Sequence, residues 1–269
     1  MFNSEIITPW LPQNLESLHK QEKELRTKSI LEINADNNLK EQLIITQESL
    51  NMIVDITRSY KTEDNIELTI QYLGARVFNS IVIAINLILS GYYQGSVMLQ
   101  RDIVETGFLL DYFLSDKSKI EEWKGSSTMQ RIDKFSPSKI RKALDKRDGF
   151  KESKRGEIYG LMAEVATHPT YEGLQLLAQD GKMHIGPFFD AKYLKHLVNE
   201  LALRVPHFTV IYISHFEKLP TTLLKVKAEY LLKIQDWFHK YINSDSSHLD
   251  ITNQLEQVKS DLERISQLK

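Results

Sequence analysis

Residues 94–114 read QGSVMLQRDIVETGFLLDYFL, and this stretch carries two helical patterns at once. Leu99, Ile103 and Leu110 recur at helical spacing, followed by Phe113 and Leu114, so one face of the helix is apolar. An apolar stripe of this kind faces the core of a folded protein. The stretch is therefore expected to form the helix around which the other helices pack.

A second face of the same helix carries mixed chemistry. Arg101, Glu105, Phe108 and Tyr112 follow one another at steps of four, three and four, which places them along one side. An arginine and a glutamate four residues apart can pair, and here they stand inside an apolar run. A partly buried ion pair with further partners is therefore predicted. The pair either orders the bundle interior, or Arg101 holds a phosphate-like anion while Glu105 orients it.

Apolar residues at helical spacing predict further helices along the chain. The expected helices span residues 13–31, 39–60, 65–90, 117–124, 137–147, 151–166, 190–217, 221–242 and 249–268. Asp64 has the side chain of an N-cap, and Pro137 suits a first helical turn. The strand signal is Asp180–Gly181 between short apolar segments, which predicts a hairpin with strands near 174–178 and 183–186.

These elements predict an all-α fold: a multi-helix bundle with a small β-hairpin insert and flanking N- and C-terminal helices. The expected organisation is an N-terminal helical segment at 1–64, a helical core at 65–242 with the hairpin near 174–187, and a linker with an amphipathic helix at 243–269. That last helix carries an apolar seam at steps of four and three. The seam is expected to dock either on its own bundle or on a second subunit.

Composition narrows the classes of function. The 269-residue chain is 42% hydrophobic and 26% charged, with a net charge of −2, so no overall basic field draws it to nucleic acid or membrane. It has no cysteine, which excludes disulfides, thiolate catalysis and zinc–thiolate sites. Metal-binding and cofactor-binding motifs are also missing from the sequence, so we expect no metal and no cofactor.

Location is predicted from what the sequence lacks. The N-terminus has no basic segment followed by an apolar one, so a secretory signal is not expected. The longest uncharged run lies between Arg76 and Arg101, and its continuous apolar part, residues 81–89, is far shorter than the roughly 20 residues that span a bilayer. We expect a buried core helix there, no membrane partner and a cytoplasmic protein.

Two further residues are candidates for acid–base chemistry. His168 precedes Pro169 at the end of the predicted helix 151–166, where the helix dipole favours a protonated imidazole. It either caps the helix or serves as a general acid or base. Tyr159 lies nine residues earlier, so a continuous helix would place its side chain on a nearby face.

The predicted helix 137–147 is strongly basic, through Lys139, Arg141, Lys142, Lys146 and Arg147. A run of this kind is commonly a solvated surface. The alternative is contact with RNA phosphates, although aromatic residues for base stacking are not interleaved with the basic ones.

The order of these motifs resembles a bacterial all-helical family described mainly as a domain of unknown function. The matching features are Arg101-x-x-x-Glu105, a helix with Tyr159 that ends at His168-Pro169, and a segment, residues 180–187, of the form Asp-Gly-x-x-x-x-Gly-Pro. They cover roughly residues 65–217. That family is similar to the HEPN superfamily of helical bundles.

The HEPN resemblance implies a function. Many HEPN proteins are dimeric, metal-independent RNases of toxin–antitoxin and antiphage systems, with an Arg-x(4–6)-His motif at the subunit interface. No arginine here has a histidine at that spacing, so His168 would have to approach Arg101 through the fold. The resemblance implies an RNA-targeting effector with Arg101, Glu105, Tyr159 and His168 as catalytic residues. The alternative is a non-catalytic helical module that binds a protein partner or a small ligand.

Overall fold

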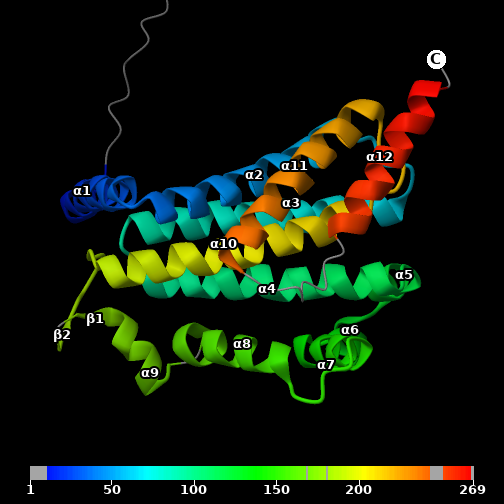
Figure 1. The fold of residues 1–269 in the computed structure, drawn as a ribbon. Coiled ribbons are helices and arrows are strands. Elements are labelled where there is room, and N and C mark those ends of the chain that lie inside the picture. Colours follow the sequence, from blue (N-terminus) through cyan, green and yellow to red (C-terminus); the bar gives the residue numbers. More distant parts are fainter. Residues whose placement is uncertain (1–10, 168, 180, 243–250, 268–269) are drawn as a thin grey trace, which may run out of the picture.

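The computed structural model describes residues 11–167, 169–179, 181–242 and 251–267, and within them it is an all-α bundle with one antiparallel hairpin (Figure 1). The predicted fold class is confirmed. The elements are α1 Gln13–Ala35, α2 Asn37–Ser59, α3 Asn65–Leu89, α4 Tyr93–Ser115, α5 Ser118–Gly125, α6 Thr128–Phe135, α7 Pro137–Arg147, α8 Lys154–Met162, α9 Tyr171–Leu174, β1 Ala178–Gln179, β2 Lys182–Met183, α10 Ala191–Ser214, α11 Thr221–Tyr241 and α12 Ile251–Gln267.

Aspartates start three of the long helices. The side chains of Asp36, Asp64 and Asp190 each accept two backbone N–H groups at the starts of α2, α3 and α10. These bonds satisfy N–H groups that have no partner within the helix. The predicted N-cap at Asp64 is confirmed.

Helix α4 lies between two layers of helices. On one side it packs against α3 and α10, and on the other against α7, α8 and a π-helical turn, Ala163–Thr167 (Figure 1). Ile103, Leu110 and Phe113 of its apolar face are buried. The second face meets the other layer, where Tyr112 packs edge-on against Phe135 of α6. The apolar face of residues 94–114 is therefore largely buried, and the second face is partly buried.

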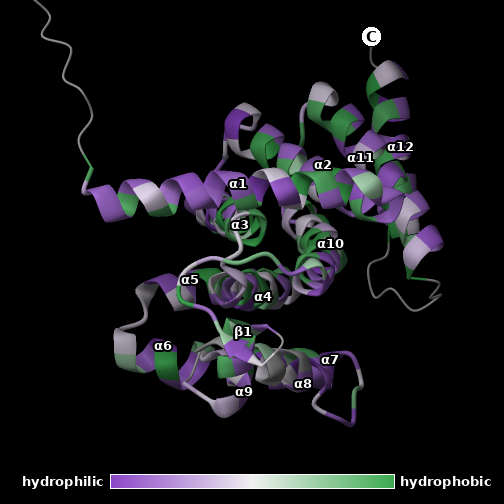
Figure 2. Ribbon diagram, turned by 90° about the vertical axis from the view of Figure 1, so that its left-hand side faces the viewer, coloured by the Kyte–Doolittle hydropathy of each residue, from purple (hydrophilic) through white to green (hydrophobic). Residues whose placement is uncertain are grey.

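The remaining long helices complete the first layer. Helix α10 packs on α2 and α4, and α11 packs on α2 (Figure 1). Figure 2 shows α3 and α10 rich in hydrophobic residues, whereas α1 is largely hydrophilic along its length. The C-terminal helix α12 packs on α11 of the same chain and buries Ile251, Leu255 and Val258. The apolar seam thus docks on its own bundle, the first of the two predicted options.

Helix α3 is the one described helix long and apolar enough to cross a membrane, a test that core helices of soluble proteins also meet. Its side chains at Ile70, Val77, Ile81 and Ile88 are buried in the common core. This burial agrees with the predicted core helix.

The region between α7 and α10 differs from the prediction. Of the predicted strand 174–178, only Ala178 is in a strand, because Thr170 caps a helical turn, α9, and residues Gln175–Leu177 continue it as a 3₁₀ turn. The hairpin is confined to two residue pairs, Ala178–Met183 and Gln179–Lys182. Asp180 lies outside the described residues, and Gly181 has the positive φ that such a turn requires. Helix 151–166 starts at Lys154, and α6 and α9 were not predicted.

A substitution in α4 tests how closely α4 and α10 pack. A Cβ at Gly107 would overlap the ring of Phe208, so Gly107→Ala is expected to lower the free energy of unfolding by about 2 kcal/mol. Gly160→Ala in α8 is the matched control, since nothing lies within 4 Å of its added Cβ. The control should gain up to about 1 kcal/mol from helix propensity. Urea denaturation measures both, and equal changes would contradict the packing.

A buried histidine makes stability depend on pH. His215 follows α10, and its Nε2 lies 3.0 Å from the carbonyl oxygen of Leu110. Burial lowers the pKa of His215 to about 4, despite that hydrogen bond. Between this pKa and the unfolded value near 6.5, the unfolded chain takes up a proton that the folded chain does not. The stability contribution of a neutral His215 is therefore complete above pH 6.5 and is lost as the pH falls toward 4.

The expected loss from His215 alone is about 2.5 kcal/mol between pH 7 and pH 4.5. Denaturation of wild type and His215→Gln at both pH values measures it, because other titrating groups cancel in the difference. The stability gap between the two proteins should shrink by that amount at pH 4.5. A gap that stays constant with pH would show that His215 is not held neutral.

Candidate functional site

The candidate site lies where α4, α7 and α8 meet. Arg101 and Glu105 come from α4, Arg141 from α7 and Tyr159 from α8. Nη2 of Arg101 lies 2.9 Å from Oε1 of Glu105 and also donates a hydrogen bond to the hydroxyl of Tyr159. The Arg101 and Glu105 side chains are 21% and 29% exposed, so the predicted partly buried pair is present and has the third partner that it needs.

Tyr159 is contacted by two guanidinium groups. The Arg101 guanidinium carbon lies 4.7 Å from the centre of its ring, and that of Arg141 lies 3.7 Å from it. Both distances are within the range of cation–π attraction. Burial and the neighbouring Glu105 carboxylate raise the pKa of Tyr159, while Arg101 acts in the opposite direction. The hydroxyl therefore stays protonated at neutral pH and can donate a hydrogen bond.

Polar atoms without partners gather in this cluster. Nε of Arg101, Oε1 of Glu105 and Nη1 of Arg141 are buried and make no hydrogen bond. The contact of Oε1 with Arg101 is close enough for an ion pair, but its angle lies outside hydrogen-bond geometry. Unpaired buried polar groups are costly, and they mark sites that a ligand group or a water molecule completes.

An ionic network holds α7 and α8 against α4 beside the candidate site. Arg155 of α8 bonds Asp145 at 2.8 Å and also donates to Asp148, and Arg147 bonds Asp111 of α4 at 2.7 Å. The Arg155 side chain is only 13% exposed. Burial acts to raise the pKa of Asp148, but hydrogen bonds from Arg147 and Arg155 outweigh it and lower that pKa. These charges are therefore compensated, and the network fixes the position of Tyr159.

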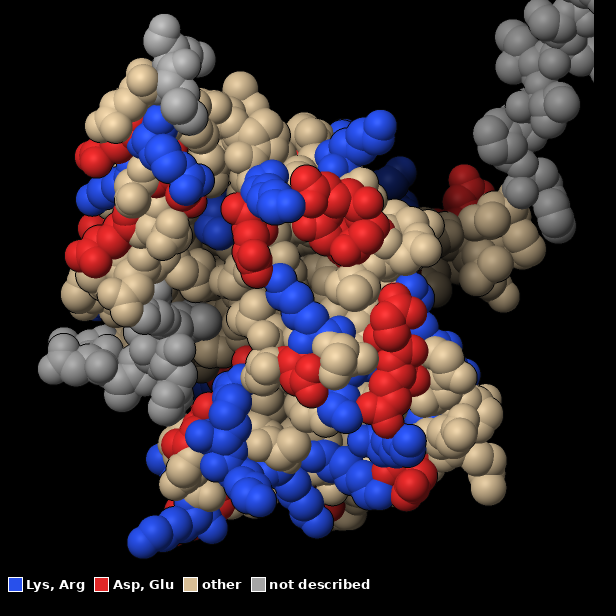
Figure 3. All heavy atoms as spheres, turned by 90° about the vertical axis from the view of Figure 1, so that its right-hand side faces the viewer, with Lys and Arg blue, Asp and Glu red and all other residues tan. Residues whose placement is uncertain are grey.

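Positive charge is concentrated in the α5–α8 layer. Residues 117–155 contain 13 lysines and arginines but six acidic residues, in a chain whose net charge is −2. Figure 3 shows the lysines and arginines gathered over this layer, in the lower part of the view. Two of the six acids, Asp145 and Asp148, are buried in the network with Arg155. Because Arg147 and Arg155 neutralise these two acids, the excess of seven positive charges remains with the other residues of the segment.

The predicted RNA-binding residues divide into two groups. Lys139, Lys142 and Lys146 are exposed on α7, and Lys139 pairs with Asp133 of α6 at 2.8 Å. Arg141 is instead partly buried and stacks on Tyr159. It thus joins the predicted catalytic cluster to the basic surface, a link that helical spacing alone did not indicate.

The structure brings three of the four predicted catalytic residues together, namely Arg101, Glu105 and Tyr159. His168 lies outside the described residues, so its role stays a prediction. Arg155 was not predicted as a site residue. The excess of positive charge over residues 117–155 could have pointed to Arg155. This arginine follows the predicted basic helix 137–147 and belongs to the same basic segment.

Among the described residues, no group of three or more histidine, cysteine, aspartate or glutamate side chains could hold a metal ion. The described side chains of the candidate site carry guanidinium, carboxylate and phenol groups. Guanidinium groups bind phosphate and carboxylate oxygens.

Comparisons of the chain with models of known protein families, with curated proteins and with solved structures found no match. The resemblance to HEPN proteins therefore rests on the sequence motifs alone.

Proposed function

We propose that the protein is a HEPN-like effector that binds RNA through the α4–α7–α8 face and cleaves it. The observation that carries this proposal is the pair of guanidinium groups, Arg101 and Arg141, on the ring of Tyr159, each with a nitrogen that lacks a partner. A phosphodiester oxygen would complete both groups, because charge-assisted bonds from guanidinium to phosphate are among the strongest in proteins.

The surroundings of the site support a polymeric anion rather than free phosphate. Lys142 and Lys146 are exposed on the same helix as Arg141, so neighbouring phosphates of one strand would meet further cations. Contacts of this kind release counterions from the nucleic acid and supply most of the non-specific affinity. Tyr159 adds a protonated hydroxyl within reach of the phosphate held by Arg101.

In the proposed reaction, the RNA 2′-hydroxyl oxygen forms a bond to phosphorus and the bond from phosphorus to O5′ breaks. A base removes the 2′-hydroxyl proton, an acid delivers a proton to O5′, and the products are a 2′,3′-cyclic phosphate and a 5′-hydroxyl. We assign the acid–base role to His168 and charge stabilisation to Arg101 and Tyr159. Glu105 orients Arg101, since it pairs with the guanidinium at 2.9 Å.

The HEPN resemblance extends the proposal to assembly and biology. We propose that two copies form a homodimer in the cytoplasm and that the cleavage serves defence against phage. Sedimentation at micromolar concentration tests the dimer. A monomer over the whole concentration range would contradict that part while leaving the proposed RNA site open to its own test.

Cleavage is tested with purified protein and structured RNA in EDTA. Wild type should nick the RNA and leave cyclic phosphate ends, whereas His168→Ala and Arg101→Lys should lose at least 100-fold in rate, since lysine cannot reproduce the guanidinium fork. Lys61→Met is the control, because Lys61 is distant in sequence from every residue of the candidate site. This variant should cleave like wild type. Full activity in His168→Ala, or no cleavage by wild type, would overturn the proposed reaction.

A further inference from the structure

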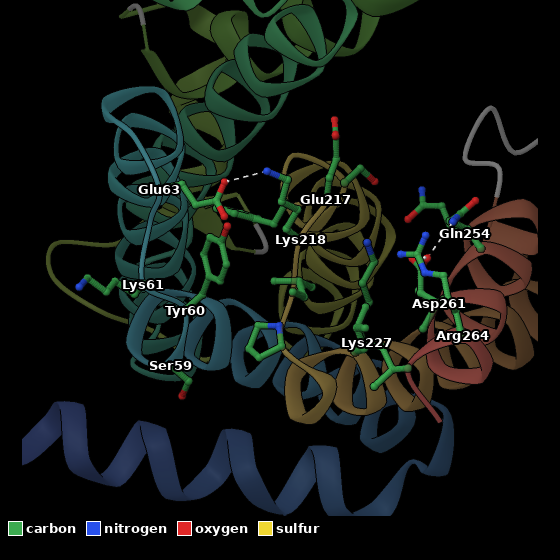
Figure 4. A pocket seen from close by; sticks show the side chains of 18 residues that line it. Ser59, Tyr60, Lys61, Glu63, Glu217, Lys218, Lys227, Gln254, Asp261 and Arg264 are labelled. Carbon is green, nitrogen blue, oxygen red and sulfur yellow. Dashed lines mark hydrogen bonds and ion pairs between the residues drawn. The ribbon is translucent and has the colours of Figure 1, made fainter. Parts of the chain in front are cut away.

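A second candidate site lies in the layer of long helices, away from the α4–α7–α8 site. There the end of α2, the end of α10, the start of α11 and helix α12 surround a cavity of about 960 Å³ (Figure 4). Its volume is at the upper end of the range for small-molecule sites. Leu224, Val258 and Ile265 contribute apolar wall, and polar groups enter from several elements. None of these residues belongs to the α4–α7–α8 site.

Lys227 of α11 is the charged group inside this cavity. It is 8% exposed, and Figure 4 shows its side chain extending from α11 toward the space between Glu217 and Gln254. Its Nζ donates one hydrogen bond, to the backbone carbonyl oxygen of Ile213 at 3.2 Å. An ammonium group has three donors, so two are left for a partner in the cavity.

Apart from Lys61, which is exposed, the other charged residues around the cavity are already paired. Lys218 pairs with Glu63 at 3.1 Å, Arg264 with Asp261 at 3.4 Å, and Glu217 with Lys117 at 2.6 Å. Among the described residues, no ion pair neutralises Lys227. A buried charge without a counterion is costly.

Two further observations point to a ligand. Burial lowers the pKa of Lys227 to about 8, and the more distant Asp261 opposes this shift only in part. The group is therefore mostly cationic at neutral pH. Oε1 of Gln254, on the other side of the cavity, is buried and accepts no hydrogen bond. The cavity thus offers a cation, an unused acceptor and an apolar wall.

We propose that this cavity binds a small organic carboxylate, whose head group pairs with Lys227 while its apolar body lies against Leu224, Val258 and Ile265. The carboxylate supplies the missing counterion and accepts the two free N–H donors of the ammonium. The apolar wall selects against simple inorganic anions, because they leave it exposed to water. A hydroxyl or amide N–H group on the ligand would donate a hydrogen bond to the unpaired Oε1 of Gln254.

Octanoate is a suitable probe, because it combines a carboxylate with an eight-carbon body. Isothermal titration calorimetry of the full chain should show octanoate binding with a negative heat-capacity change, the signature of apolar burial. Lys227→Met keeps a long unbranched side chain and removes the charge, and it should weaken octanoate at least tenfold. Lys225→Met changes an exposed lysine of the same helix that does not line the cavity, so it is the matched control and should bind octanoate within twofold of wild type.

A second measurement does not depend on how well a variant folds. Wild type is treated briefly with acetic anhydride, with and without octanoate, and acetylation of each lysine is read by mass spectrometry. Octanoate should reduce acetylation of Lys227 at least fivefold and leave that of Lys225 unchanged. Equal octanoate affinity in Lys227→Met, no octanoate binding by wild type, or equal competition by inorganic phosphate would each overturn the proposal.

Discussion

Arg155→Ala is expected to lower the free energy of unfolding by about 3–5 kcal/mol, the largest effect on stability that we expect from a single substitution outside the apolar core. Arg155 bonds Asp145 and Asp148, and all three side chains are largely buried. Removing the cation leaves the buried Asp145 carboxylate without an ion-pair partner, whereas Asp148 is still bound by Arg147. The measurement is urea denaturation at pH 7, read by circular dichroism.

The control for this prediction is Lys146→Ala. Lys146 is an exposed cation of the adjacent helix, and exposed ion pairs contribute at most about 1 kcal/mol. A double variant that also replaces Asp145 by asparagine should recover part of the loss, because the charge that lost its partner is removed with it. If Arg155→Ala and Lys146→Ala unfold at the same denaturant concentration, the network does not hold α8 in place.

Replacing Lys139, Lys142 and Lys146 together by glutamine is expected to weaken RNA binding about 100-fold at 0.1 M salt. Each lysine that contacts a phosphate releases roughly one counterion, so three of them should reduce the slope of log K against log salt by about two to three. Filter binding over a range of salt concentrations measures both quantities. The three lysines are exposed, so the fold should not change.

Three lysines of α11 provide the matched control, since Lys225, Lys233 and Lys240 are exposed and lie on the other layer of the bundle. Replacing them by glutamine changes the net charge by the same amount. If binding falls equally in both triple variants, RNA responds to overall charge, and the α7 surface is not its site.

Much of the fold could be predicted because its helices carry regular apolar patterns. The pattern of residues 94–114 predicts both faces of α4. Ile103 and Leu110 recur at the spacing of a buried helix face, whereas Arg101 and Glu105 lie on another side of the helix. The hairpin was predicted at the correct place but with strands that are too long. Local capping by Thr170 stabilises helical turns there, and an apolar run does not reveal such capping.

The site could be predicted only in part, because its parts come from three helices. The spacing of Arg101 and Glu105 is a local signal, and Tyr159 could be named from its helix. The stacking of Arg141 on Tyr159 depends on how α7 and α8 return across α4, which no local pattern encodes. The cavity around Lys227 has the same origin, since α2, α10, α11 and α12 all contribute to it.

Photocrosslinking tests the proposed RNA site most directly. RNA that contains 4-thiouridine is irradiated with the 269-residue chain at 0.1 M salt, and the cross-linked peptides are identified by mass spectrometry. We expect cross-links within residues 137–159, around Arg141 and Tyr159, and their loss in the triple variant of α7. Cross-links that fall on α1 or α11 instead, with none in residues 137–159, would contradict RNA binding at the α4–α7–α8 face.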